Sequence, residues 1–466
     1  MSDLAAYRDL IARKRVAAVP TGLPHRVELN GDLFDHQRVA TEFALRAGRA
    51  ALFLDTGLGK TACALEWGRV VVEATNKPVL MLAPLGVVQQ HVREAERIGV
   101  EARASRTGEP PARPMVAITN YDRLERFNAD DYAGVILDES SILKSFSGVT
   151  TRRLIDTFAK TPFRLCCSAT PAPNDHTELG QHSQFLGVMP SSEMLSRWFI
   201  ADQNNAGKYR LKKPAVRSFW DWVESWARCI SKPSDIGFDD SGFVMPELRV
   251  TRHVVEADRS QDAGEEKDGQ QRLFRMPSTS ATSIHQEKRL TKDARAEKAA
   301  ALIAAEPGEA WVVWCDTDYD ADALKALMPT INEVRGSMSI DVKEDRLTAF
   351  SSGESKTILT KPTIAGYGLN WQHCARVIFL GLSFSYENYY QAIRRCWRFR
   401  QQRPVEVHVI CSDTEAAIWD VVSRKSADHE RMKVEMAAAM ARAFQSSEVL
   451  SNYNPELEAR LPAWLS

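Results

Sequence analysis

The sequence predicts an α/β protein that contains two parallel β-sheets in tandem, with a mainly helical insertion between them. Short apolar runs alternate with helical patterns from about residue 31 to 180, and the alternation returns from about 291 to 430. Uninterrupted apolar strands separated by helices are typical of parallel sheets covered on both faces. A chain of 466 residues also exceeds the size of one ordinary core. The predicted units are an N-terminal helix and connector (1–30), the first sheet (31–180), an insertion and flexible linker (181–290), the second sheet (291–430), and a C-terminal helix and tail (431–466).

Separate apolar runs carry the strand prediction in each unit. In the first unit we expect strands at Ala51–Leu54, Val79–Ala83, Val116–Thr119, Gly134–Leu137 and Arg164–Ser168. In the second unit we expect them at Trp311–Trp314, Thr357–Thr360, Arg376–Leu380 and Val405–Ile410. In the insertion, Ser218–Ile230 has a helical pattern whose aromatic face we interpret as core packing, with base stacking as the alternative. Gln261–Gln271 is highly charged and nearly free of apolar residues, so we expect a linker or exposed loop there.

Composition excludes several classes of protein. The formal net charge of −1 argues against an overall polybasic binder, so any nucleic-acid surface must be local. The eight cysteines form no C-x-x-C pair, which argues against a zinc site or a disulfide framework and favours a reducing compartment. Met1–Val19 carries charges throughout, so we expect neither a signal peptide nor a membrane span, no membrane partner, and a cytoplasmic location.

A glycine-rich turn follows the first apolar strand and leads into a helical pattern. It reads Asp-Thr-Gly-Leu-Gly-Lys-Thr over Asp55–Thr61. Glycines let successive backbone N–H groups point at a polyphosphate, Lys60 can reach the β and γ phosphates, and the Thr61 hydroxyl can hold Mg²⁺. A plain glycine-rich turn is the alternative. The residues predicted to bind nucleotide here are Thr56, Gly57, Leu58, Gly59, Lys60 and Thr61.

Two carboxylates follow another strand of the same unit. Asp138 and Glu139 end the run from Gly134, and in a parallel sheet they emerge at the same edge as the glycine-rich turn. Asp138 can then hold Mg²⁺, while Glu139 can polarise the water that attacks a γ-phosphate. Solvated loop acids are the alternative, although the preceding Lys60 and Thr61 favour the catalytic interpretation.

Weaker signals surround these motifs. Gln37 lies upstream of the turn, where its amide could bind the adenine edge or simply cap a helix. Ser168 and Thr170 follow a strand, and their hydroxyls could relay the state of the acidic loop or cap a helix. Gly366 and Gly368 belong to a second glycine loop, which allows close approach to a ribose or phosphate but also fits a tight turn with positive φ.

An arginine-rich run in the second unit supplies the opposite charge. Gln391, Arg394 or Arg395, and Arg398 recur on one face of a helix. A solvated basic face is the usual explanation, but interleaved tyrosine and tryptophan residues are too apolar for one. We predict that Arg395 and Arg398 point across a cleft at the γ-phosphate as arginine fingers, so that hydrolysis depends on domain closure.

The set of motifs resembles the superfamily-two helicases and translocases, and most closely the Swi/Snf-type ATPases. The resemblance covers about 31–175 and 290–425. It is carried in order by Asp55–Thr61, Ala83-Pro84-Leu85, Ile118–Asp122, Leu137-Asp138-Glu139, Ser168–Pro171, Arg335-Gly336-Ser337, Ala365–Asn370 and Gln391–Gln401. It implies two RecA-like domains, ATP and Mg²⁺ as cofactors, hydrolysis stimulated by nucleic acid, and movement along duplex DNA. A compact bacterial or phage form is the expected source.

The resemblance also assigns further residues. It implies nucleic-acid contacts at Pro84, Thr119, Asn120, Gly336 and Gly366, nucleotide contacts at Gly368 and Gln391, and coupling through Ser168 and Thr170. Two departures stand out. Ser141 replaces the histidine or aspartate of relatives, which predicts a weaker hydrogen bond to the coupling motif, and Phe399-Arg400-Gln401 replaces isoleucine-glycine-glutamine. The alternatives are a strand-separating DNA or RNA helicase, and a nucleic-acid clamp or loader with slow ATPase activity.

Overall fold

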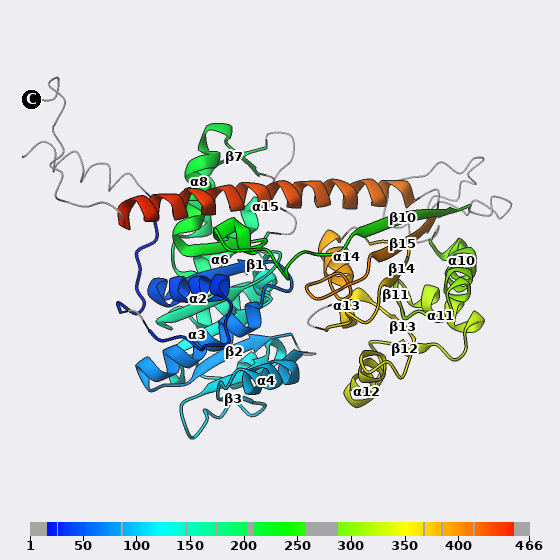
Figure 1. Cartoon of the computed structure of the whole chain (residues 1–466), viewed down its shortest axis with the longest axis horizontal. Helices are drawn as coiled ribbons and strands as arrows, with labels where there is room; N and C mark the ends of the chain where they lie inside the picture. Colours follow the sequence, from blue (N-terminus) through cyan, green and yellow to red (C-terminus); the bar gives the residue numbers. More distant parts are fainter. Residues whose placement is uncertain are drawn as a thin grey trace, which may run out of the picture.

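The computed structural model shows two α/β domains side by side, with a long helix running across both (Figure 1). It describes residues 16–25, 27–84, 87–144, 148–172, 175–202, 209–256, 288–366, 369–383, 385–412 and 415–451. The predicted fold class is confirmed, because each domain is built on a parallel sheet. The expected N-terminal helix, the linker Gln261–Gln271 and Gly368 lie outside the described residues.

The first domain is built on seven parallel strands in the order β3-β4-β2-β5-β6-β1-β9. Every position of β2, β4 and β5 is buried, which is why these strands read as continuous apolar runs. The strands are β1 (Arg49–Leu54), β2 (Val79–Ala83), β3 (Ala102–Ala104), β4 (Val116–Asn120), β5 (Gly134–Asp138), β6 (Phe163–Cys167) and β9 (Ala227–Ile230). The helices are α2 (Asp35–Ala47), α3 (Lys60–Thr75), α4 (Val88–Arg97), α5 (Val149–Thr157), α6 (Leu179–Leu186), α7 (Ser191–Trp198) and α8 (Val216–Trp226).

The insertion differs in one element from the helix expected over Ser218–Ile230. The helix α8 ends at Trp226, and the next four residues form β9, which pairs in parallel with β1 at the edge of the sheet. This pairing joins residues that are far apart in the chain, and no helix-breaking residue separates Trp226 from Ala227. The aromatic face of α8 is buried, as the core-packing interpretation expects. An antiparallel hairpin, β7 (Phe199–Ala201) and β8 (Tyr209–Leu211), stands beside it.

The second domain is built on six parallel strands in the order β10-β15-β14-β11-β13-β12. Its edge strand β10 comes from the predicted insertion and pairs over its whole length with β15. The strands are β10 (Leu248–Val255), β11 (Trp311–Cys315), β12 (Asn332–Val334), β13 (Thr357–Thr360), β14 (Arg376–Leu380) and β15 (Val405–Ser412). The helices are α10 (Lys292–Ala305), α11 (Asp318–Leu327), α12 (Ile340–Ser351), α13 (Pro362–Ala365) and α14 (Tyr386–Ile393).

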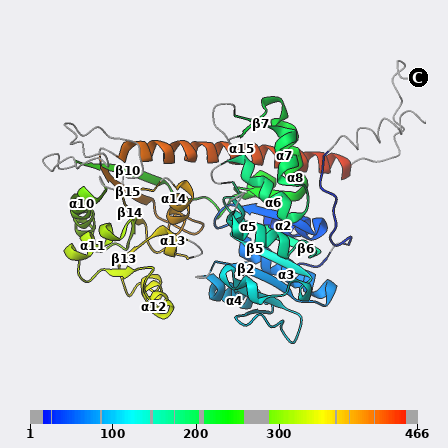
Figure 2. The same ribbon diagram turned by 180° about the vertical axis from the view of Figure 1, so that it is seen from behind.

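A single helix, α15 (Ala416–Ser451), bridges the two domains, as both views show (Figures 1 and 2). Its first turns place Ile418 and Val422 in the core of the second domain. Further along, Met432 and Met436 lie in the core of the first domain. The helix begins well before residue 431, where the sequence led us to expect it. Among the described residues, no helix is long and apolar enough to cross a membrane.

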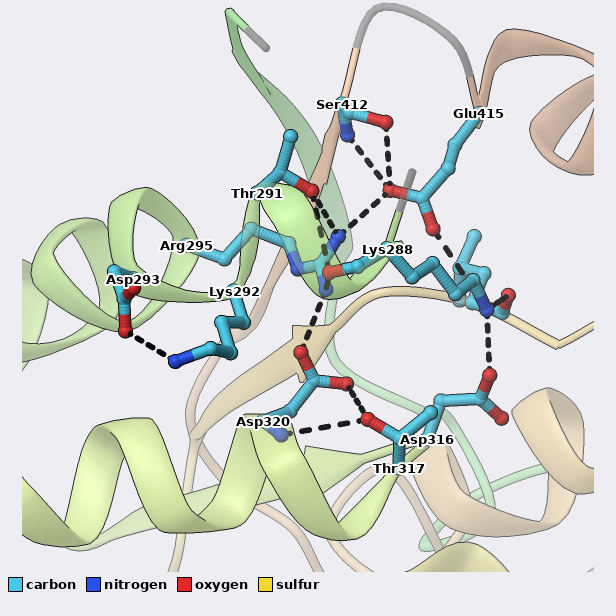
Figure 3. A network of polar contacts seen from close by, with 11 residues as sticks. Lys288, Thr291, Lys292, Asp293, Arg295, Asp316, Thr317, Asp320, Ser412 and Glu415 are labelled. Atoms are coloured by element: carbon cyan, nitrogen blue, oxygen red, sulfur yellow. Dashed lines mark hydrogen bonds and ion pairs between the residues drawn. The ribbon is translucent and has the colours of Figure 1, made fainter. Parts of the chain in front are cut away.

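A buried polar network fixes the start of α15 to the second domain (Figure 3). Arg295 of α10 is fully buried and binds Asp320 (2.6 Å) and Glu415 (3.2 Å). Lys288 contacts Asp316 at 2.5 Å and donates to the carbonyl of Leu382 at 2.6 Å. Glu415 directly precedes α15, so these ion pairs tie the helix to the carboxyl edge of the sheet.

Candidate active site

The glycine-rich turn joins β1 to α3 as predicted, with Lys60 as the first residue of the helix. Gly57 (φ +97°) and Gly59 (φ +81°) adopt left-handed backbone, which favours glycine. The Lys60 ammonium donates to the carbonyls of Leu54 (2.8 Å) and Asp55 (3.3 Å). Burial lowers the pKa of Lys60, and the nearby carboxylates of Glu139 and Asp55 oppose that shift. The lysine is thus held at the base of the loop by two backbone acceptors.

The predicted Mg²⁺ ligands sit at the same edge of the sheet. Thr61 lies in the first turn of α3, and Asp138 is the last residue of β5. Mg²⁺ takes oxygen ligands and usually combines one or two protein groups with water and substrate phosphates. A hydroxyl and a carboxylate beside a phosphate loop fit that donor set.

Glu139 combines an unusual backbone conformation with a buried carboxylate. It has φ +54°, which is uncommon for a residue other than glycine. Its Oε2 atom is buried and has no hydrogen-bond partner among the described residues. Burial, together with the adjacent Asp138 carboxylate, raises the pKa of Glu139 to about 7, against the opposing charges of Lys60 and Arg395. A buried carboxylate with a spare lone pair can accept a hydrogen bond from water.

Asp138 is held in place by two side chains that the sequence did not reveal. The Oδ2 atom of Asp138 lies 2.7 Å from the Nε2 atom of His91, on α4. The Tyr121 hydroxyl donates to the backbone carbonyl of Asp138 at 2.6 Å. Tyr121 is the first residue of the 3₁₀ helix η2 (Tyr121–Arg126). It belongs to the motif Ile118–Asp122, in which we predicted no role for this tyrosine.

The remaining nucleotide and coupling residues are also at this edge. Gln37 is buried: its side chain accepts from the Phe34 N–H (3.1 Å) and donates to the Leu58 carbonyl (3.1 Å), so it caps α2 and props the loop. Ser168 accepts from the Thr170 N–H (3.0 Å). The Thr170 hydroxyl accepts from Gln391 of the second domain (3.3 Å), which joins the two predicted motifs directly.

One carboxylate of the phosphate loop forms the densest contact between the domains. Asp55 accepts from the Tyr390 hydroxyl (2.8 Å), from Arg394 (2.7 Å) and from Lys433 of α15 (3.0 Å). Burial alone would raise the pKa of Asp55, but Arg394 and Lys433 hold it well below its usual value. We call these four residues the Asp55 clamp. A second pair, Lys144 and Glu387, also crosses between the domains.

Of the predicted arginine fingers, Arg395 is buried and Arg398 is half-buried, and both donate hydrogen bonds within their own domain. Arg395 donates to the carbonyl of Leu369 (3.2 Å) and to Gln391, and Arg398 donates to the Leu369 carbonyl (3.2 Å). Burial and the neighbouring arginines lower the pKa of Arg398 to about 10. Arg394, which we did not choose, is the arginine that reaches the phosphate loop.

Phe399 explains the unusual end of the arginine run. A Cβ atom on Gly57 would lie 2.5 Å from the Cβ of Phe399, so the second domain packs directly on the loop glycine. The Phe399 ring stacks on Phe243 with centroids 4.6 Å apart. Arg400 is exposed and has φ +70°, a conformation that suits the glycine found in relatives.

The predicted nucleic-acid contacts lie on several loops. Pro84 follows β2, while Thr119 and Asn120 end β4 and are buried, with Thr119 Oγ1 and Asn120 Oδ1 lacking a hydrogen-bond partner among the described residues. Gly336 is exposed after β12, and its carbonyl accepts from Lys343. Gly366 has ordinary φ (−72°), so a positive-φ turn does not explain it; a Cβ there would meet the Pro362 carbonyl oxygen at 2.2 Å.

The acidic motif makes its own hydrogen bond through a neighbour of Ser141. Ser141 is buried, and the adjacent Ser140 hydroxyl lies 3.1 Å from Nε2 of His182 on α6. Burial lowers the pKa of His182 to about 4, so the imidazole is neutral. The acidic loop therefore contacts α6, and no local sequence pattern predicted this contact.

Part of the chain matches a family of known proteins. Residues 294–400 match the family described as the helicase conserved C-terminal domain, a stretch that contains Gln391, Arg395 and Arg398. This match confirms the predicted resemblance to helicases and the predicted enzyme class, a nucleic-acid-dependent ATPase of the helicase and translocase type. No curated protein matches the chain.

A solved structure is similar over nearly the whole chain. It is the Sulfolobus solfataricus SWI2/SNF2 ATPase core in complex with double-stranded DNA, with a TM-score of 0.42 and 16% sequence identity. The similarity covers 94% of this chain and 100% of that chain. At this TM-score and identity it assigns neither an activity nor a ligand to the present chain.

Proposed function

We propose that this protein is an ATP- and Mg²⁺-dependent translocase that moves along duplex DNA. The observation that carries the proposal is the direct contact between the phosphate loop and the arginine-bearing segment after α14. Arg394 binds Asp55 of the loop, and Gln391 binds Thr170 at the carboxyl edge of the same sheet. A nucleotide bound to that loop therefore lies where both domains can contact it, so its hydrolysis can drive their separation.

The residues would divide the chemistry in the following way. Backbone N–H groups of Gly57 to Lys60 receive the phosphates, and the Lys60 ammonium leaves its two carbonyl acceptors to neutralise them. Thr61 and Asp138 would hold Mg²⁺, which would supply positive charge beside the phosphates. Glu139 orients the attacking water through its unpaired oxygen. Arg395 and Arg398 would turn from the Leu369 carbonyl to the γ-phosphate when ATP binds between the domains.

The choice of duplex DNA as the track rests on the resemblance to the Swi/Snf-type ATPases. The bacterial or phage source expected from the compact chain remains part of the proposal. The most informative experiment measures ATP hydrolysis with no nucleic acid, with duplex DNA, with single-stranded DNA and with RNA. We expect duplex DNA to stimulate turnover most. Equal rates in all four conditions would contradict translocation and favour a slow nucleotide-gated clamp.

Strand separation is distinguished from translocation by a second pair of assays. A duplex translocase strips a third strand from a triplex without opening the duplex beneath it. We therefore expect ATP-dependent triplex displacement and no displacement of one strand of a plain duplex. The reverse result would assign the protein as a strand-separating helicase.

A further inference from the structure

Two side chains contact Asp138, the residue whose carboxylate is predicted to bind Mg²⁺. His91 contacts its Oδ2 atom (2.7 Å), and the Tyr121 hydroxyl contacts the backbone carbonyl of the same residue (2.6 Å). The His91–Asp138 pair is almost dry, because the two side chains are only 5% and 9% exposed. Two independent hydrogen bonds therefore fix both the backbone and the carboxylate of Asp138.

Both of these side chains follow segments at which the resemblance to the Swi/Snf-type ATPases implies nucleic-acid contacts. His91 lies on α4, the helix that follows β2 and the turn at Pro84. Tyr121 comes directly after Thr119 and Asn120 at the end of β4. Each segment predicted to contact nucleic acid is thus followed by a residue whose side chain contacts Asp138. A displacement of either segment has a direct route to the Mg²⁺ ligand.

The chemistry of the contacts favours a functional role over packing. The Nε2 atom of His91 is the ring nitrogen that contacts the Asp138 carboxylate. The other ring nitrogen, Nδ1, is buried and has no partner among the described residues. An unpaired buried polar atom costs free energy that an apolar side chain would avoid.

We propose that His91 and Tyr121 are positioning residues that transmit nucleic-acid occupancy of the Pro84 and Asn120 segments to the Mg²⁺ carboxylate of Asp138. This inference rests on the proposed function. Mg²⁺ requires near-ideal octahedral geometry, so a small shift of the carboxylate changes how well the ion is held. Nucleic acid that binds these segments more tightly in one position of α4 and η2 would favour the matching position of Asp138. Stimulation by nucleic acid then arises at the metal ligand itself.

The test uses the full chain with His91→Ala, His91→Gln and Tyr121→Phe. The first readout is the Mg²⁺ concentration that half-saturates binding of a fluorescent ADP analogue, measured without nucleic acid or turnover. The second is the ratio of ATPase rates with and without saturating duplex DNA. The third is the affinity for that DNA. Glu96→Gln, an exposed change on α4, is the matched control and should leave all three readouts unchanged.

Loss of the His91 contact should raise the half-saturating Mg²⁺ concentration about 10- to 100-fold, as loss of an outer-shell partner does at other metal sites. The stimulation ratio of His91→Ala and Tyr121→Phe should fall at least fivefold, while DNA affinity changes less than twofold. His91→Gln should retain most of the parent's Mg²⁺ affinity and stimulation ratio, because the glutamine amide can donate a hydrogen bond to Asp138.

Other outcomes would overturn the inference. If His91→Ala keeps the parent's Mg²⁺ requirement and stimulation ratio, His91 does not position Asp138. If the Mg²⁺ requirement rises but the stimulation ratio does not change, His91 positions Asp138 without transmitting nucleic-acid binding, which also contradicts the proposal. Failure of the proposed function looks different. In that case the unmodified protein itself shows no stimulation by any nucleic acid, while the Mg²⁺ titration still reports whether His91 positions Asp138.

Discussion

Replacing Asp55 with asparagine should open the contact between the two domains. The side chains of Asp55, Arg394 and Lys433 are 11%, 5% and 14% exposed, so all three charges are largely out of water. Asparagine keeps the shape of the side chain but removes the buried counter-charge that Arg394 and Lys433 share. Removing one partner of a buried ion pair costs about 3–5 kcal/mol. Because 1.4 kcal/mol is tenfold, the ratio of closed to open protein should fall roughly 150- to 4,000-fold.

Single-molecule energy transfer measures this ratio directly. All eight cysteines are buried, so a dye pair can be attached to new surface cysteines, for example Lys77→Cys in the first domain and Glu354→Cys in the second. The nucleotide-free parent should populate mainly the high-transfer, closed state. The Asp55→Asn variant should populate mainly a low-transfer state, with unchanged circular dichroism as evidence that both domains remain folded.

A matched control uses the same lysine. Glu430 lies 3.4 Å from Lys433 but is 62% exposed. Exposed ion pairs contribute about 0–1 kcal/mol, so Glu430→Gln should change the closed-to-open ratio only a few-fold at most. Lys433→Met, which leaves the Arg394–Asp55 pair intact, should have an effect between the two. If Asp55→Asn stays closed to the same extent as Glu430→Gln, the Asp55 clamp does not hold the domains together.

Three further predictions follow from the same geometry. Arg395→Ala and Arg398→Ala should each lower ATP turnover about 10³-fold or more with little change in ATP affinity, and normal turnover in both would remove the arginine-finger assignment. Because the pKa of Glu139 is raised from 4.5 to about 7, the folded metal-free protein binds this proton more tightly than the unfolded chain, so stability should fall as pH rises between those values. Thermal denaturation in EDTA should show this part of the pH dependence lost in Glu139→Gln, and an unchanged profile in the variant would contradict it. Arg295→Ala should lower the free energy of unfolding, measured by urea denaturation, by about 3–5 kcal/mol, because it leaves Asp320 buried without its ion-pair partner and Glu415 with only the more distant Lys288. A loss under 1 kcal/mol would show that the network is not needed.

The sequence predicted those parts of the fold whose signal is local. Strands buried on both faces are long apolar runs, and β2, β13 and β14 match their predicted bounds. The short edge strand β9 was missed because its four residues continue a helical pattern and are fixed only by pairing with β1. The start of α15 at Ala416 was also missed. The first turns of this helix pack in the core of the second domain and later turns in the core of the first, so the helix does not follow one core along its length.

The same division holds for the candidate site. Lys60 and Asp138 could be predicted from the sequence because each has a fixed place in a short motif beside a strand. Lys433 could not be found in that way, because its partner Asp55 lies 378 residues away in the chain. His91 on a helix also resembles an ordinary core histidine until its distance to Asp138 is known. Contacts that join two domains depend on how the domains sit together, which no local pattern encodes.

The central claim is that the phosphate loop converts ATP hydrolysis into movement along nucleic acid. The most direct test compares ATP turnover of the unmodified protein and of Lys60→Ala, each with and without duplex DNA. Our account predicts turnover that rises with duplex DNA in the unmodified protein, and none above background in Lys60→Ala although it remains folded. DNA-stimulated turnover that survives in Lys60→Ala, or an unmodified protein that no nucleic acid stimulates, would contradict the account.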